Sequence, residues 1–94
     1  MKVYLSSSFG KKIKKFNKKE KLELDKEIQK IIKNPALGTE KKGDLRGVFV
    51  HKFNLQKTLF LLAYRIVGND MELIMIGPHE NYYRDLKSYL KKRK

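Results

Sequence analysis

The fold of this 94-residue chain is decided by residues 58–77, TLFLLAYRIVGNDMELIMIG. Two runs that are almost entirely apolar, residues 58–67 and 71–76, flank the segment Gly68-Asn69-Asp70. A Gly-Asn pair between such runs is typical of a tight β-hairpin turn. Nearly continuous apolar runs of this length favour strands that are covered on both faces. The sequence therefore predicts a buried antiparallel hairpin.

A third strand is predicted immediately before this hairpin, over residues 45–55. Its side chains alternate between the two faces of the strand. One face would carry Val48, Val50 and Lys52, and the other would carry Phe49, His51 and Phe53. Residues 54–57 then turn the chain into the run that begins at residue 58. Short connections between consecutive strands make the three strands an antiparallel meander.

Two helices are predicted between residues 6 and 33, after a short strand over residues 2–5. The serines at positions 6–8 can cap the first helix, which has the apolar stripe Phe9, Ile13 and Phe16. Lysines cover the rest of this helix, and no acidic residue occurs before Glu20. The second helix, from about residue 19 to residue 33, ends at Asn34-Pro35, because a residue before proline avoids helical backbone. Helices joined this tightly form an antiparallel hairpin.

The remaining segments complete a single domain over residues 1–94. Residues 35–44 form a loop, and a last helix follows Glu80, with Tyr83, Leu86 and Leu90 on one face. These elements predict an α+β fold. In it the N-terminal helical hairpin packs on a small antiparallel sheet, in the order β-α-α-β-β-β, followed by a C-terminal helix.

The composition points to an anionic partner. The chain has 23 Lys and Arg against 10 Asp and Glu, a formal net charge of +13. Such an excess favours nucleic acid, an acidic protein or an anionic membrane surface as partner. The absence of cysteine excludes a disulfide scaffold and a cysteine-ligated zinc site. No apolar run approaches the roughly 20 residues that span a bilayer, so we expect a cytoplasmic protein with no membrane partner.

The segment that follows the last strand, Gly77-Pro78-His79-Glu80-Asn81-Tyr82-Tyr83-Arg84, concentrates polar groups at a strand end. The chain has no glycine-rich phosphate loop, and its two histidines are too few for a metal site. Histidine, arginine, lysine and tyrosine suit RNA cleavage without a metal, because RNA carries its own nucleophile, the 2′-hydroxyl. The candidate set is His79, Arg65, Tyr82, Tyr83, His51, Lys52 and Arg46.

Each candidate also has a structural interpretation. His79 could cap the last helix, and Tyr83 could belong to the core. His51 shares a strand face with two phenylalanines, so a core histidine is the better reading. Tyr82 is expected to be exposed. Arg65 lies in an apolar strand and needs the sheet edge, a carboxylate partner or a ligand, whereas Lys52 and Arg46 could be surface charges.

At this point the chain resembles the RelE/ParE superfamily of bacterial type II toxins. The resemblance covers most of the chain. It rests on Asn34-Pro35 with Gly38, on Gly43-Asp44-Leu45-Arg46-Gly47, on Leu61-Leu62-Ala63-Tyr64 and on Ile76-Gly77-Pro78-His79-Glu80-Asn81-Tyr82-Tyr83. It implies a helical hairpin on an antiparallel sheet and a hetero-oligomer with an acidic antitoxin encoded by the adjacent gene. RelE-like members cut mRNA in the ribosomal A site with no metal or cofactor, whereas ParE-like members inhibit DNA gyrase.

Carried over residue by residue, the resemblance implies roles for a few side chains. His79 and Tyr83 match the family's C-terminal histidine and tyrosine, and Lys52 matches a basic position on the second strand. RelE-like nucleases usually have an arginine where this chain has Leu61, and Arg65, next to Tyr64, faces the other way in a regular strand. The expected catalytic residues are His79, Tyr83 and Arg65. The expected RNA-binding residues are Arg46, Lys52, His51, Tyr82 and Arg84.

The leading hypothesis is thus a ribosome-dependent mRNA endoribonuclease. The alternatives are a gyrase inhibitor that is not a nuclease, or an inactive homologue that only binds antitoxin or RNA.

Overall fold

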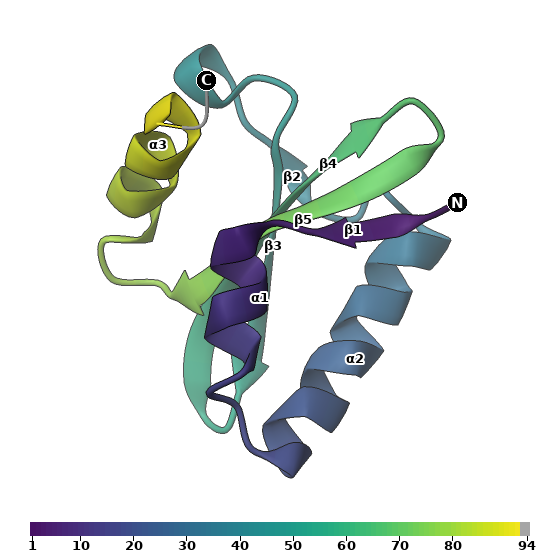
Figure 1. Ribbon diagram of the computed structural model, residues 1–94, viewed down its shortest axis with the longest axis vertical. Helices are drawn as coiled ribbons and strands as arrows, with labels where there is room; N and C mark the ends of the chain where they lie inside the picture. Colours follow the sequence, from purple (N-terminus) through teal and green to yellow (C-terminus); the bar gives the residue numbers. More distant parts are fainter. Residues whose placement is uncertain (93–94) are drawn as a thin grey trace.

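A computed structural model describes residues 1–92, and residues 93 and 94 of the predicted domain lie outside the described range. Figure 1 shows one sheet, with α1 and α2 lying apart from α3. The elements in chain order are β1 Val3–Leu5, α1 Ser7–Ile13, α2 Lys18–Lys33, β2 Thr39–Glu40, a 3₁₀ turn η1 Gly43–Leu45, β3 Phe49–Leu55, β4 Thr58–Val67, β5 Asp70–Pro78 and α3 Tyr82–Lys92.

The sheet has the strand order β1-β5-β4-β3-β2. The predicted antiparallel meander is confirmed, since β3 pairs with β4 and β4 pairs with β5 in antiparallel register. β1 adds to β5 in parallel, with Val3 opposite Met71, so the sheet is mixed and mostly antiparallel. The predicted loop over residues 35–44 also contains the short edge strand β2 and the start of η1.

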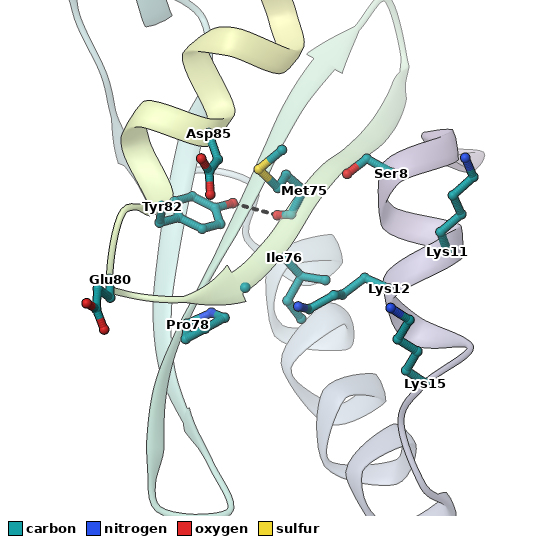
Figure 2. A pocket seen from close by; sticks show the side chains of 11 residues that line it. Ser8, Lys11, Lys12, Lys15, Met75, Ile76, Pro78, Glu80, Tyr82 and Asp85 are labelled. Carbon is teal, nitrogen blue, oxygen red and sulfur yellow. Dashed lines mark hydrogen bonds between the residues drawn. The ribbon is translucent and has the colours of Figure 1, made fainter.

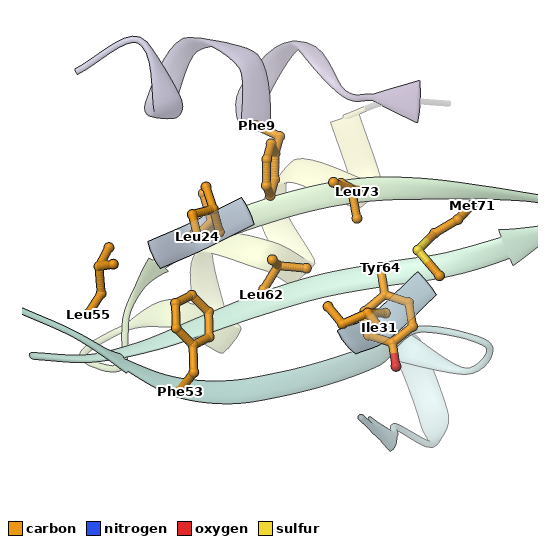
Figure 3. Packing of buried hydrophobic residues seen from close by; sticks show 10 residues of the cluster. Phe9, Leu24, Ile31, Phe53, Leu55, Leu62, Tyr64, Met71 and Leu73 are labelled. Carbon is orange, nitrogen blue, oxygen red and sulfur yellow. The ribbon is translucent and has the colours of Figure 1, made fainter. Parts of the chain in front are cut away.

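Two apolar cores lie on opposite faces of the sheet. The larger core lies between the sheet and the helices α1 and α2, and Figure 3 shows its packing. It contains Phe9, Leu24, Ile31, Phe53, Leu55, Leu62, Tyr64, Met71, Leu73 and Ile76. The smaller core lies under α3 and contains Leu45, Val48, Val50, Leu61, Ala63, Ile74, Tyr82 and Leu86. Each buried strand is thus covered on both faces, as its apolar run predicts.

Polar caps begin both N-terminal helices. The Ser6 hydroxyl accepts a hydrogen bond from the Phe9 amide at 3.0 Å, which confirms the predicted serine cap of α1. Asn17 and Glu20 form a reciprocal capping box at the start of α2. These caps satisfy amides that have no partner inside a helix, so they fix the residues at which the two helices begin.

A β-bulge interrupts the pairing of β4 with β5. Ala63 lies opposite Met75 and Tyr64 lies opposite Leu73, so Ile74 has no partner residue on β4. The Ile74 carbonyl instead accepts a hydrogen bond from the Ser6 hydroxyl, and the Ser6 amide donates to the Leu73 carbonyl. The bulge therefore lies where β1 ends and α1 begins.

The turn after α2 is fastened to the sheet by Tyr64. The Tyr64 hydroxyl donates to the Pro35 carbonyl at 2.7 Å and accepts from the Gly38 amide at 2.9 Å. Burial raises the pKa of Tyr64, and the bond from Gly38 only partly offsets that rise. A Cβ at Gly38 would lie 2.8 Å from the Tyr64 hydroxyl oxygen, so the turn leaves no room for a side chain there.

Candidate functional site

His79 lies where β5 gives way to α3, and its backbone is bonded on both sides. Its amide donates to the Leu59 carbonyl at 3.1 Å, and its carbonyl accepts from the Tyr82 amide at 3.2 Å. The His79 side chain is exposed. Within residues 1–92 it has no hydrogen-bond or ion-pair partner. A fixed backbone with a free imidazole is an arrangement that suits proton transfer to a bound molecule.

Lys52 lies on the same face of the sheet as His79. Lys52 is paired with Leu61, and Leu61 is paired with Gly77, which precedes His79 by two residues. Two strand spacings across and two residues along the sheet separate the backbones of Lys52 and His79 by about 12 Å. Leu61 itself is 0% exposed and forms part of the floor between them.

Tyr82 and Tyr83 begin α3 above this part of the sheet. Tyr82 is 3% exposed, so the expectation of an exposed ring is wrong. Its ring packs over Gly77, and its hydroxyl donates to the Met75 carbonyl at 2.6 Å. Burial accordingly raises the pKa of Tyr82 above its ordinary value of 10.0.

Tyr83 is half-buried beside Tyr82 at the start of α3. Its half-buried ring meets the Tyr82 ring edge-on at a centroid distance of 5.8 Å and packs against the smaller core. The Lys41 ammonium lies 4.9 Å from the ring centroid, a geometry that allows a cation–π interaction. The exposed part of the Tyr83 ring therefore lies next to the Lys41 ammonium group.

Arg65 is not brought to His79. Its Nε donates to a Glu72 carboxylate oxygen at 2.9 Å across the β4–β5 pair. It lies six residues along β4 from Leu59, the residue bonded to His79, which is about 20 Å in a strand. The required carboxylate partner of Arg65 is therefore present, but the predicted grouping of Arg65 with His79 is wrong.

His51 lies on the opposite face of the sheet, under α2. Its Nε2 is 2.8 Å from a Glu27 carboxylate oxygen, and its ring stacks on Phe53 at 5.6 Å. The preferred reading as a core histidine is confirmed. Burial raises the pKa of Glu27, but hydrogen bonds from His51 and Lys30 outweigh this effect and hold the pKa below its ordinary value of 4.5.

Arg46 and Arg84, the other two arginines among the predicted site residues, are exposed. Arg46 follows η1, where Asp44 lines a recess with Lys87 and Lys91 of α3. Arg46 therefore lies near the C-terminal half of α3, which is about 16 Å long. His79 precedes the first turn of α3, so the two residues lie near opposite ends of this helix. Arg84 projects from that first turn, with its Nε 3.7 Å from the Asp85 carboxylate.

A cleft that the sequence analysis did not predict lies between α1 and the start of α3 (Figure 2). It has a volume of about 420 Å³, and one wall carries Lys11 and Lys12 of α1 and Lys15 of the turn that follows it. The lysine-rich first helix was visible in the sequence, but only the fold shows that this helix lies beside β5.

No group of three or more His, Asp or Glu side chains in residues 1–92 could hold a metal ion. No helix in the described range is long and apolar enough to cross a membrane.

Comparisons with known proteins agree with this architecture. A sequence profile described as "ParE-like toxin of type II bacterial toxin-antitoxin system" matches residues 3–87. Comparison with curated proteins gives no match.

Three solved structures share the fold at low sequence identity. A chain of the intact E. coli RelBE toxin-antitoxin complex has 16% identity and a TM-score of 0.66, covering 84% of this chain and 96% of that one. A mutant E. coli RelE toxin in the free state has 17% identity and a TM-score of 0.71, covering 98% and 95%. The YoeB/ParE toxin from Agrobacterium tumefaciens has 19% identity and a TM-score of 0.67, covering 84% and 99%.

The profile spans most of the chain, and the three solved structures share the fold of this chain. The chain therefore belongs to the ParE-like toxins of type II bacterial toxin–antitoxin systems.

Proposed function

We propose that the chain is a RelE-like toxin that cleaves mRNA on the ribosome and so arrests translation in the cytoplasm. The observation that carries the proposal is the exposed, unpaired imidazole of His79 on the sheet face that also presents Lys52. A nuclease needs a proton carrier and a cation within reach of one phosphate, and we assign these roles to His79 and Lys52.

The proposed reaction uses the substrate's own hydroxyl. The 2′-oxygen attacks the adjacent phosphorus, the bond to the 5′-oxygen of the next nucleotide breaks, and a cyclic phosphate and a free 5′-hydroxyl result. His79 accepts the 2′-hydroxyl proton or protonates the leaving oxygen. Lys52 stabilises the charge that develops on the phosphate, and Tyr83 stacks on or orients a base.

An acidic antitoxin is the proposed partner that keeps this activity in check. The formal net charge of +13 favours a partner of opposite sign. A type II toxin is by definition paired with an antitoxin, and we propose a hetero-oligomer with the product of the adjacent gene.

A second candidate function is inhibition of DNA gyrase without nuclease activity. One observation favours it. The family position at which nucleases carry an arginine is Leu61, which is fully buried here, and the nearby Arg65 is paired with Glu72 at the far end of β4. The nuclease proposal therefore has one cation fewer beside His79 than the resemblance would supply.

One expression experiment separates the two functions. The chain is expressed from a tightly repressed promoter, and mRNA 5′ ends and chromosome integrity are mapped in the same cells. We expect new ends within coding regions, and His79→Ala should reduce cleavage by about 100- to 10,000-fold, the range for a general acid or base. Lys52→Ala should reduce it by about 100-fold, whereas the exposed Lys26→Ala should leave it unchanged.

Growth arrest with intact mRNA and broken DNA would establish the gyrase candidate instead. Full cleavage by a folded His79→Ala protein would remove His79 from the mechanism. Circular dichroism of each purified variant checks that the fold is kept.

A further inference from the structure

Lys41 differs from every other lysine of the described chain in its burial. The other lysines of residues 1–92 are exposed, whereas Lys41 is half-buried. Partial burial of a charge is costly when nothing compensates the charge. Arg65, the half-buried arginine in this range, is compensated by Glu72. Lys41 forms no ion pair with a carboxylate in residues 1–92, so it is a cation that is free to take an anion.

The side chain of Lys41 is held in place at both of its ends. Its backbone follows β2, and its amide donates to the Val48 carbonyl at 2.8 Å. Its ammonium lies 4.9 Å from the centroid of the Tyr83 ring, a distance at which the ring attracts a cation. A free lysine loses much rotamer freedom when it binds a ligand. Lys41 has already lost part of that freedom, which favours binding.

The Tyr83 ring links Lys41 to the end of α3 that lies next to His79. The Tyr82 amide donates to the His79 carbonyl, and Tyr83 is the next residue. The Tyr83 ring packs against the smaller core and meets the Tyr82 ring edge-on. Lys41 therefore lies beside the first turn of α3, although it comes from a different part of the chain.

We propose that Lys41 binds a phosphate of the mRNA and that Tyr83 is the positioning residue that holds Lys41 for this purpose. The inference rests on the proposed function, because it places the RNA beside His79. A ring face that is covered by an ammonium cannot stack a base at the same time, so on that face Tyr83 acts through Lys41. Lys41 thereby supplies a cation that the fully buried Leu61 does not.

A phosphate of single-stranded RNA suits this pair of side chains. Sites for single-stranded RNA combine aromatic rings, which border the bases, with cations that follow the backbone. The phosphate charge is permanent at neutral pH, so it can bind an ammonium that is partly withdrawn from water. An acidic protein segment is the competing ligand, and the experiment includes it.

The test uses the purified full chain and ribosomes that carry an mRNA with a 2′-O-methyl group in the A-site codon. This mRNA cannot be cut, because its nucleophile is blocked, so affinity is measured apart from cleavage. Lys41→Gln should weaken binding by about tenfold, since it removes one charged contact. It should also lower the slope of log affinity against log salt by about 0.7, the value for one phosphate of a single strand.

The role of Tyr83 is tested by separating its ring from its hydroxyl. Tyr83→Phe keeps the ring and should bind within about twofold of the parent, whereas Tyr83→Leu should lose about as much as Lys41→Gln. K41Q/Y83L should lose no more than either single variant, because both changes break the same contact. In the free chain, the ring should shift the NMR signals of the Lys41 methylene protons upfield, and Tyr83→Leu should abolish this shift.

The matched control is Lys42→Gln, which removes the same charge from the next residue. Lys42 is exposed and has no ring contact in residues 1–92, so this variant should bind within about twofold of the parent. Lys41→Arg keeps the charge and the attraction to the ring and should also stay close to the parent. Circular dichroism of each variant checks that the fold is kept.

Four results would overturn the inference. Parent-like binding by Lys41→Gln would remove Lys41 from the site. Equal losses in Lys41→Gln and Lys42→Gln would show that only the charge of this segment matters. An equal loss in Tyr83→Phe and Tyr83→Leu would assign the role to the hydroxyl. Binding of a polyglutamate peptide that depends on Lys41, with unchanged ribosome binding by Lys41→Gln, would assign Lys41 to an acidic protein.

The proposed function fails by different results. A parent chain that binds these ribosomes but does not cut the unmodified mRNA would remove the nuclease proposal alone, since the affinities still decide the role of Lys41. A parent chain that neither binds nor cuts would remove both. A parent chain that cuts, beside a Lys41→Gln variant that binds and cuts equally well, would remove only the role of Lys41.

Discussion

His51 and Glu27 join β3 to α2 through one contact that depends on charge. Hydrogen bonds to the carboxylate hold the pKa of Glu27 below 4.5. A carboxyl with a lowered pKa in the folded state stabilises the fold above its unfolded pKa, and this stability is lost as the pH falls through the folded value. The contact should therefore contribute at neutral pH and fade in acid.

We expect Glu27→Gln to lower the free energy of unfolding by about 1–2 kcal/mol at neutral pH, since it removes a charged hydrogen-bond acceptor. The difference from the parent should shrink as the pH falls below 4.5. Urea unfolding at several pH values measures both effects. Asp25→Asn, on the exposed side of α2, is the control and should change stability by less than about 0.5 kcal/mol. A difference that is independent of pH would contradict the assigned role of the charge.

Two glycines make a second matched pair at this scale. Gly38→Ala should destabilise by about 1–3 kcal/mol, because its Cβ would meet the Tyr64 hydroxyl at 2.8 Å and the Val50 backbone at 3.1 Å. Gly10→Ala, inside α1 with no atom within 4 Å of the new Cβ, should stabilise by about 0.5–1 kcal/mol. Thermal unfolding of the two variants should shift in opposite directions. A shift of the same sign would refute the packing argument at Gly38.

Single residues were predicted well where one face of a strand decided the outcome. His51 is half-buried under α2, on the strand face that its neighbours Phe49 and Phe53 indicated. Tyr82 was misplaced, because no local pattern shows that Gly77 leaves a hollow for its ring. The separation of Arg65 from His79 could be predicted, because it follows from the direction of β4. The pairing of Arg65 with Glu72 could not, because it depends on the register between β4 and β5.

At the scale of elements, α3 is held to the sheet through Tyr82 and Leu86. Burial raises the pKa of Tyr82, so a proton is retained in the folded state when the unfolded chain would release it. Stability from such a group is fully present below the unfolded pKa and is lost as the pH rises above it. Alkaline conditions should therefore loosen the attachment of α3.

We expect Tyr82→Phe to cost about 1 kcal/mol at neutral pH, through the lost bond to the Met75 carbonyl. Above about pH 10 it should lose stability less steeply than the parent, because its ring cannot ionise. The exposed Tyr4→Phe should keep the parent's alkaline slope and serves as the control. Denaturant titrations across this pH range provide the comparison, and identical slopes for all three chains would contradict the assignment.

Helices and strands were predicted correctly where a long run of apolar residues or a long helical periodicity marked them. β4 runs over Thr58–Val67, as its apolar run predicted, and α2 begins within a residue of its expected start. β2 has two residues, too few for any periodicity, and exists because the chain after α2 runs beside β3. The parallel pairing of β1 with β5 joins segments about 70 residues apart, and local patterns carry no information on such a contact.

For the whole molecule, the dominant property is the net charge of +13. Like charges on a small domain repel one another and oppose the compact state, and dissolved salt screens this repulsion. We expect the midpoint of thermal unfolding to rise by about 5 °C between about 20 mM and about 300 mM salt. K21E/K26E, which replaces a positive by a negative charge at each of two exposed sites, should show a smaller rise. A midpoint that is independent of salt would mean that the charges are too dispersed to matter.

The extra residue at Ile74 reverses which face of the sheet the odd-numbered residues of β5 lie on. In an unbroken alternation, every odd-numbered position from Met71 onwards would lie beneath α1 and α2, and His79 would be among them. The bulge places two consecutive residues on the α3 side, so odd-numbered positions switch sides after it. A sequence comparison that counts strand positions without this step would assign the imidazole to the wrong half of the molecule. Any graft of the β5–α3 segment into another sheet must therefore carry the bulge with it.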